Sequence, residues 1–255
     1  MDEIFTSFDA STLSLAVAVA MLAAYGIGLL IGRRWRERHR RSLESKFDDA
    51  SVALLGLLLA FAFGASIVKH DNRRLMVVAD SNSIGDFYVC ASLLKEPVRT
   101  QLRNLIRDYA ELRLEAALQL SPKGSLEGVL RQSEQMQAQM TNLVARALNG
   151  GTPIAVPLTN SLNNLTSSHS ARLAAVRDRL PGSIFLLLFA TAILATMLVG
   201  REQGASEITE AAGTLCFIVI VAFAVYVTLD LNQPTRGLIK VSQEPIQRLL
   251  SSMPN

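Results

Sequence analysis

The chain has 255 residues, half of them apolar, and contains only two cysteines, Cys90 and Cys216. Its formal net charge of +3 is too small to indicate a nucleic-acid partner, and neither cysteine has metal-ligand spacing to a neighbouring side chain. The composition instead fits a membrane protein with a sizeable polar part.

Four stretches of the chain carry no charged side chain, and each is long enough to cross a bilayer. An α-helix rises ~1.5 Å per residue, so roughly 20 apolar residues span a hydrocarbon core of ~30 Å. A soluble helical protein has no reason to keep charges out of four windows of this length. The stretches therefore predict four transmembrane helices, at Ala10–Gly32, Ala50–Val68, Leu180–Gly200 and Ala211–Leu229.

A polar insert of about 110 residues, Lys69–Arg179, separates the second stretch from the third. Nothing breaks the second helix at Val68, so we expect it to continue towards Leu94, until Pro97 disfavours helix before it. Apolar residues spaced three and four apart then predict three further helices in the insert. They lie at about 98–116, 126–148 and 158–180.

The predicted fold class is an all-α membrane protein, with four transmembrane helices and an extramembrane helical bundle between spans two and three. The bundle is rooted in the membrane at both ends, and it is large enough to form a domain of its own. The predicted segments are 1–68 (N-terminal segment, first span, basic loop and second span), 69–179 (helical bundle), 180–229 (third and fourth spans) and 230–255 (C-terminal juxtamembrane segment).

The orientation in the membrane is read from the basic residues. The densest basic cluster, Arg33–Arg41, follows the first span, and the positive-inside rule places it in the cytoplasm. Both termini and the helical bundle then lie on the outer side. A second set of basic residues flanks the insert and argues for the inverted orientation. This set comprises Lys69, Arg73, Arg74, Arg172, Arg177 and Arg179.

Small residues recur every fourth position in the first two spans. Such spacing lets helix backbones approach closely within lipid. It predicts a tight helix–helix interface, within one subunit or between the subunits of a homo-oligomer; the alternative is the ordinary tolerance of Ala and Gly in membrane helices. The candidate packing residues are Gly28, Gly32, Gly56 and Ala60.

No catalytic residue, metal ligand set or cofactor motif emerges from the sequence. The histidines, His39, His70 and His169, have no second ligand or nucleophile at useful spacing. Coupled transporters keep ionisable residues at membrane depth, and the four spans have none. A passive channel needs none, since apolar rings gate by dewetting. The candidate pore-lining or gate residues are Phe61, Phe63 and Gly64; the alternative is that these aromatics face lipid or pack.

Three ordered segments resemble the bacterial family called bestrophin-like, over roughly residues 50–250. They are Leu54–Gly64 followed by Asp71–Arg74, then Asn82–Gly85 through Leu93–Arg99, and last Asp230–Val241. The resemblance implies a multi-pass protein of the bacterial inner membrane, with periplasmic termini and bundle in the orientation preferred above. It also implies an anion channel, because bestrophins are pentameric chloride channels. The acidic, aromatic-rich calcium-clasp segments of true bestrophins are not found, so chloride selectivity and a pentamer are not carried over.

Charged residues of these segments gather at the membrane exits. We expect a polar collar at one membrane face, formed by Asp71, Arg73, Arg74, Asp230 and Arg236. The leading function is a passive ion channel in a homo-oligomer, with the lipid bilayer and ions as partners. Chloride or another anion is favoured if the basic exits line the path. The alternative is a membrane-anchored sensor or scaffold, whose helical domain binds a partner or ligand.

Overall fold

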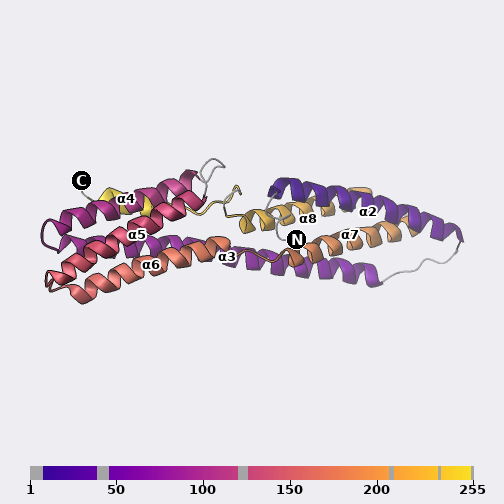
Figure 1. Cartoon of the computed structure of the whole chain (residues 1–255). Coiled ribbons are helices and arrows are strands. Elements are labelled where there is room, and N and C mark those ends of the chain that lie inside the picture. Colours follow the sequence, from indigo (N-terminus) through magenta and orange to yellow (C-terminus); the bar gives the residue numbers. More distant parts are fainter. Residues whose placement is uncertain (1–7, 39–45, 120–125, 207–209, 235–236, 254–255) are drawn as a thin grey trace. The chain divides into compact units, whose positions relative to one another are not determined.

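A computed structural model describes residues 8–38, 46–119, 126–206, 210–234 and 237–253. These residues form α-helices and connections, with no β-strand among them (Figure 1). Within the described ranges, four helical segments are long and apolar enough to cross a membrane. They are Ala10–Arg36, Asp49–Ser92, Ala155–Ala205 and Ala211–Asn232. Each contains one of the uncharged stretches, so the all-α class and the four candidate spans are confirmed.

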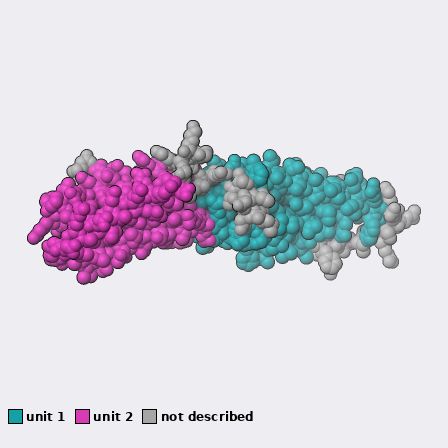
Figure 2. Space-filling view, viewed as in Figure 1, with its two compact units in different colours: residues 1–70, 179–239 teal, residues 71–178, 240–255 magenta. Residues whose placement is uncertain are grey.

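The chain divides into two compact units (Figure 2). Unit 1, residues 1–70 and 179–239, holds most of the apolar helices. These are α2 (Ala10–Arg38), the first half of α3 (Lys46–Ser92), α7 (Gly182–Ala205) and α8 (Ala211–Asn232). All four contribute to one core, in which Met21, Leu55, Phe185 and Val225 are each at most 1% exposed. Tight packing matters here because lipid tails are as apolar as the side chains and give no hydrophobic drive.

Unit 2, residues 71–178 and 240–255, contains the remaining helices. They are the second half of α3, α4 (Val98–Gln119), α5 (Leu126–Asn149), α6 (Ala155–Arg177) and α9 (Glu244–Ser252). Their apolar faces, spaced three and four residues apart, meet in one core. Its fully buried side chains include Ile84, Phe87, Leu102, Ile106, Tyr109, Met140, Leu158 and Leu165. The three insert helices therefore occur where the apolar spacing predicts them, apart from the C-terminal end of α6.

The connection between α6 and α7 departs from the helix expected up to Leu180. Residues 178–181 are not helical, because Pro181 disfavours the helical conformation in the residue before it. The free backbone N–H of Leu180 donates to Oδ1 of Asn232 at 2.8 Å. The end of α8 thus holds the start of α7 in unit 1.

The C-terminal segment contains a helix, α9, that the sequence analysis did not predict. Helix α9 begins at Glu244 with Pro245 in its first turn, where a missing N–H costs nothing. Apolar side chains of α9 and its end join the core of unit 2: Met253 is 4% exposed, and Leu249 and Leu250 pack against that core. Ser81 Oγ on α3 donates to the carbonyl of Pro245 at 2.9 Å. Residues 240–253 are therefore packed on the insert helices.

Candidate functional site

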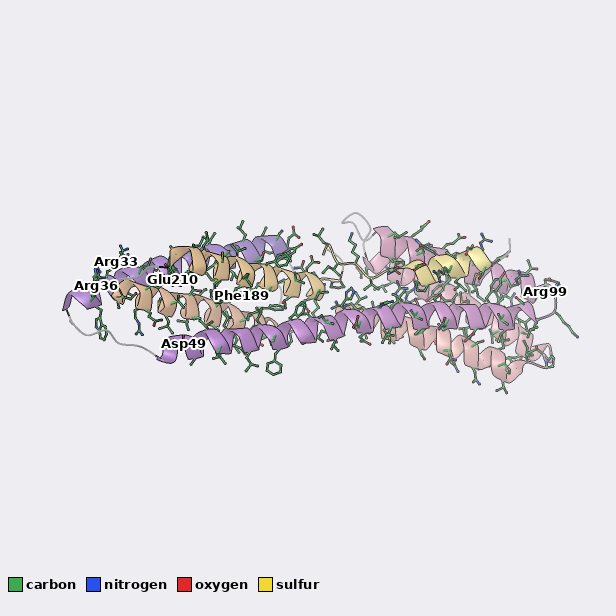
Figure 3. All side chains as sticks on the ribbon, turned by 180° about the vertical axis from the view of Figure 1, so that it is seen from behind. Arg33, Arg36, Asp49, Arg99, Phe189 and Glu210 are labelled. Carbon is green, nitrogen blue, oxygen red and sulfur yellow. The ribbon has the colours of Figure 1, made fainter. Side chains whose placement is uncertain are left out.

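The membrane half of α3 has two opposite faces. Successive residues turn by about 100° around a helix, so residues three, four and seven apart share a face. One face is buried in unit 1 and includes Leu55, Ala62 and Ser66. The other is exposed and consists of Leu57, Phe61, Gly64 and Val68. In Figure 3, α3 lies along an edge of unit 1, with side chains that point away from α7.

The three candidate pore or gate residues do not all lie on this exposed face. Phe61 is 69% exposed, and a Cβ at Gly64 would meet nothing within 4 Å. Phe63, two residues beyond Phe61, lies about 200° farther around the helix and is 38% exposed. Phe61 and Gly64 therefore share open surface within unit 1, and Phe63 faces elsewhere. Pore lining by these residues stays a prediction.

The candidate packing residues fall into two pairs, Gly28 with Gly32 on α2 and Gly56 with Ala60 on α3. A Cβ at Gly28 or Gly32 would overlap the backbone of α7, and a Cβ at Gly200 or Gly204 would overlap the backbone of α2. Glycines on both helices thus allow a close crossing of α2 and α7. On α3, nothing lies within 4 Å of a Cβ at Gly56, and Ala60 is exposed. Packing of that second pair between copies stays a prediction.

The predicted collar residues are divided between the two units, and Arg236 lies outside the described residues. In unit 2, Asp71 and Arg74 are exposed, whereas Arg73 is only 3% exposed. Arg73 Nε donates to the carbonyl of Ala175 at 3.2 Å, and its Nη2 donates to that of Asp178 at 2.9 Å. These carbonyls end α6, where they lack intrahelical partners and the helix dipole is negative. Arg73 therefore caps α6 from the side of α3.

In unit 1, the collar residue Asp230 organises the chain after α8. Its side chain is buried, and its two carboxylate oxygens accept the backbone N–H groups of Leu238 and Ile239 at 2.9 and 2.8 Å. Gly237 lies so close that a Cβ there would come within 2.9 Å of the carboxylate carbon. Residues 237–239 are thus held against the buried carboxylate at the end of α8.

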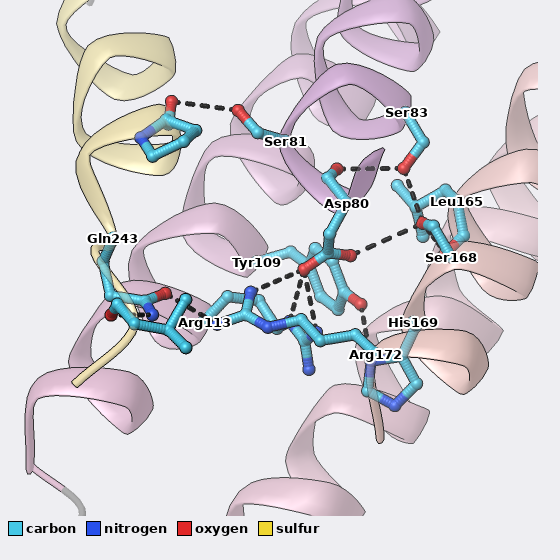
Figure 4. A network of polar contacts seen from close by, with 12 residues as sticks. Asp80, Ser81, Ser83, Tyr109, Arg113, Leu165, Ser168, His169, Arg172 and Gln243 are labelled. Carbon is cyan, nitrogen blue, oxygen red and sulfur yellow. Dashed lines mark hydrogen bonds and ion pairs between the residues drawn. The ribbon is translucent and has the colours of Figure 1, made fainter. Parts of the chain in front are cut away.

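Unit 2 contains a buried ionic cluster that the sequence analysis missed (Figure 4). The side chain of Asp80 on α3 is 0% exposed, and its Oδ2 accepts Nη2 of Arg113 at 2.8 Å and Nη1 of Arg172 at 2.7 Å. Arg172 Nη2 also donates to Oε1 of Gln243 at 2.7 Å. One buried carboxylate thereby joins α3, α4, α6 and the segment before α9. The sequence does contain a clue to this cluster: Asp80 is a charged residue that occupies a position in the apolar spacing that continues from Val77.

The phenol of Tyr109 lies beside this cluster. Its oxygen is 3.0 Å from Nδ1 of His169 and accepts Nε2 of Gln137 at 3.2 Å. Burial raises the pKa of Tyr109, the nearby Asp80 carboxylate raises it further, and Arg113 acts in the opposite direction. The phenol therefore keeps its proton, and its oxygen shares one hydrogen bond with His169 Nδ1 while it accepts another from Gln137. Tyr109 and His169 are both core residues of unit 2.

Comparisons with known proteins agree with this architecture. The family model described as Bestrophin-like domain matches residues 14–246. Two crystal structures of a bacterial bestrophin homologue from Klebsiella pneumoniae, each with one mutation, are similar to this chain with TM-scores of 0.72 and 0.70. Both are 13% identical; the first likeness covers 95% of this chain and 97% of that one, and the second covers 93% and 98%. No curated protein matches the chain.

Sequence identity this low shows a shared fold alone. The family model, by contrast, matches the sequence itself, and the match extends from the first membrane helix to α9. It therefore shows the family as well as the fold. Among the described residues, no group of three His, Cys, Asp or Glu side chains is arranged to hold a metal ion. The resemblance read from the three ordered segments is confirmed, and this chain belongs to the bestrophin-like family.

Proposed function

We propose that this chain assembles as a homo-oligomer and forms a passive ion channel across the membrane. The observation that carries the proposal is the exposed face of α3 in unit 1, which has no charge and no cover within that unit. Copies arranged about an axis would bring Leu57, Phe61, Gly64 and Val68 to the path. Phe61 has the largest of these side chains, and an apolar ring at this position gates by dewetting.

The uncharged spans favour passive flow over coupled transport. Ion-coupled and proton-coupled carriers hold substrate or protons on ionisable side chains at membrane depth. The segments 50–68 and 180–200 contain none, and neither do the other two predicted spans. Passive flow down a gradient needs only a hydrated path and a gate that opens. The exposed face of α3 can provide both.

The sign of the conducted ion depends on which charges reach the path. The sequence favours an anion only if the basic membrane exits line it. Arg73 is buried and its guanidinium is bound to carbonyls at the end of α6, while Asp71 and Arg74 are exposed. A collar built by the exposed pair on the side of unit 2 remains part of the proposal. The channel itself does not depend on the sign.

The proposal places unit 2 outside the bilayer, as an extramembrane bundle of a protein in the bacterial inner membrane. Both termini and the bundle then lie in the periplasm, with Arg33–Arg41 in the cytoplasm. Enzymatic reporters fused after Gly151 and after Asn255 test this orientation, because alkaline phosphatase is active only outside the cytoplasm. Active cytoplasmic reporters at both positions would reverse it.

A membrane-anchored sensor or scaffold is the second candidate, and a specific feature of unit 2 favours it. Two adjoining hollows of about 410 and 510 Å³ lie between α4 and α5 and share Leu105, Asp108 and Gln139. Their walls are rich in amide side chains, which suit hydrogen bonding to a polar partner. A scaffold of this kind would bind a partner there and pass no current.

Planar-bilayer recording on the purified protein tests the channel, with Phe61→Ala compared to Phe63→Ala. The two changes remove the same side chain from one helix, but only Phe61 lies on the exposed face. We expect Phe61→Ala to raise the open probability or the conductance, because it widens the apolar ring, and we expect Phe63→Ala to change neither. Absence of current in every ion tested would refute the channel and leave the scaffold.

A further inference from the structure

The exposed face of α3 continues with the same spacing into unit 2. The buried residues there are Val77, Asp80, Ile84, Phe87 and Ala91. On the opposite side every residue at steps of three and four is exposed. We call this face the α3 seam; it consists of Leu57, Phe61, Gly64, Val68, Asp71, Leu75, Val78, Asn82, Asp86, Val89 and Leu93. One unbroken helix, Lys46–Ser92, carries all of the seam except its last residue.

The α3 seam carries only negative charge. Asp71 and Asp86 are its ionisable residues, and no Lys, Arg or His occurs on it. At about 100° per residue, Lys69 and Arg74 lie to either side of the seam, roughly a quarter turn or more from its centre. Arg73 lies opposite the seam, where it is buried and bonded to α6.

The surroundings of Asp86 within unit 2 leave this charge in excess. A recess of about 500 Å³ lies between α3 and α9, and both Asp86 and Arg248 line it. The guanidinium of Arg248 is bonded to the carboxylate of Glu244 on its own helix. The carboxylates of Asp86 and Glu244 therefore accompany a single guanidinium, that of Arg248, in and beside the recess. Asn82 adds a neutral polar side chain to the recess.

We propose that the conducted ions are cations and that Asp71 and Asp86 select them. This inference rests on the proposed function, since only assembly around a path turns the seam into its lining. Each aspartate then becomes a ring of carboxylates, one from every copy. Such rings concentrate cations and repel anions in a narrow, low-dielectric path. The charge of the conducted ion is then opposite to that of the anion that is favoured if the basic residues at the membrane exits line the path.

Reversal potentials measured under a sodium chloride gradient test the sign. The wild-type protein should reverse near the sodium equilibrium potential. In Asp71→Asn/Asp86→Asn the sodium-to-chloride permeability ratio should fall by about tenfold, the lower end of the effect of charge focusing in clefts. Glu134→Gln is the matched control, because Glu134 is an exposed carboxylate of unit 2 on α5 that lies neither on the seam nor in the hollows between α4 and α5. Its ratio should equal that of the wild type.

The outcomes separate this inference from the proposed function. Current that reverses near the chloride potential, unchanged by the double substitution, overturns the inference and leaves a channel. Absence of current overturns the channel and the inference with it. A second measurement needs no current: Val89→Cys, with Cys90 and Cys216 changed to Ala, is labelled by cationic and anionic methanethiosulfonates. The cationic reagent should react about tenfold faster, and Asp86→Asn should remove the difference; equal rates before that change would also refute the inference.

Discussion

Changing Asp80 to Asn tests whether the buried ionic cluster holds unit 2 together. The substitution keeps the size of the side chain but removes its charge. Asp80 Oδ2 accepts hydrogen bonds from Nη2 and Nε of Arg113, at 2.8 and 3.3 Å, and from Nη1 of Arg172 at 2.7 Å. With the carboxylate gone, two guanidinium groups whose side chains are each only 11% exposed face one another without a counter-charge.

The expected loss of stability follows from this geometry. Removing one partner of a buried ion pair costs about 3–5 kcal/mol, and the slight exposure of both arginines favours the lower end, about 3 kcal/mol. A typical domain is stable by only about 5–15 kcal/mol, so the change uses a large share of that margin. At about 2–8 °C per kcal/mol, the unfolding midpoint should fall by roughly 10 °C.

Cys90 provides the assay, because it is half-buried and packs against the core of unit 2. A thiol-reactive dye should label it on thermal unfolding of the full-length protein in detergent, with the exposed Cys216 changed to Ala. Glu111→Gln is the matched control, since its side chain is 49% exposed and its pair with Arg107 is worth at most about 0.5 kcal/mol. Equal midpoints for Asp80→Asn and Glu111→Gln would refute the reasoning.

Two further predictions concern unit 1. Gly32→Leu should destabilise the protein by at least about 1–3 kcal/mol, because the new side chain would overlap the backbone at Arg201. Gly56→Leu should be tolerated in the monomer, since nothing lies within 4 Å of a Cβ there. Melting curves of both variants in detergent compare them, and an equal loss of stability would contradict the close crossing of α2 and α7. Asp230→Asn should cost about 1.5–3 kcal/mol, since the amide nitrogen of Asn cannot accept one of the two backbone N–H groups and the remaining hydrogen bond is no longer made to a charged group. Faster hydrogen exchange at residues 237–239 checks it; unchanged exchange would show that the carboxylate does not hold the loop.

Helix type and the number of spans were predictable because both depend on local sequence. Charge-free windows of about 20 residues have one low-energy arrangement in lipid, and apolar residues three and four apart require a helix to share a face. The end of α6 was predicted less well. Pro181 stops the helix, but the exact end at Arg177 depends on Arg73, which reaches the last carbonyls from another helix.

The candidate site was predictable in part for the same reason. Phe61 and Phe63 stand out in the sequence as a pair, yet only the packing of α3 in unit 1 decides which of them faces outward. Arg73 and Arg74 look alike as neighbours, but one is buried under α6 and the other is exposed. Burial of this kind is set by elements distant in sequence, and no local pattern contains it.

The sequence by itself determined that this is an all-helical membrane protein with four candidate spans, and its ordered motifs identified the family. The exclusion of charge from long segments and the spacing of apolar residues carry that information locally. Only the tertiary structure decided which charges are available for function. It pairs Asp80 with Arg113 and Arg172, turns Arg73 inward, and leaves Asp71 and Asp86 on an uncovered face of α3. Charges act through space, so their partners depend on how distant helices pack.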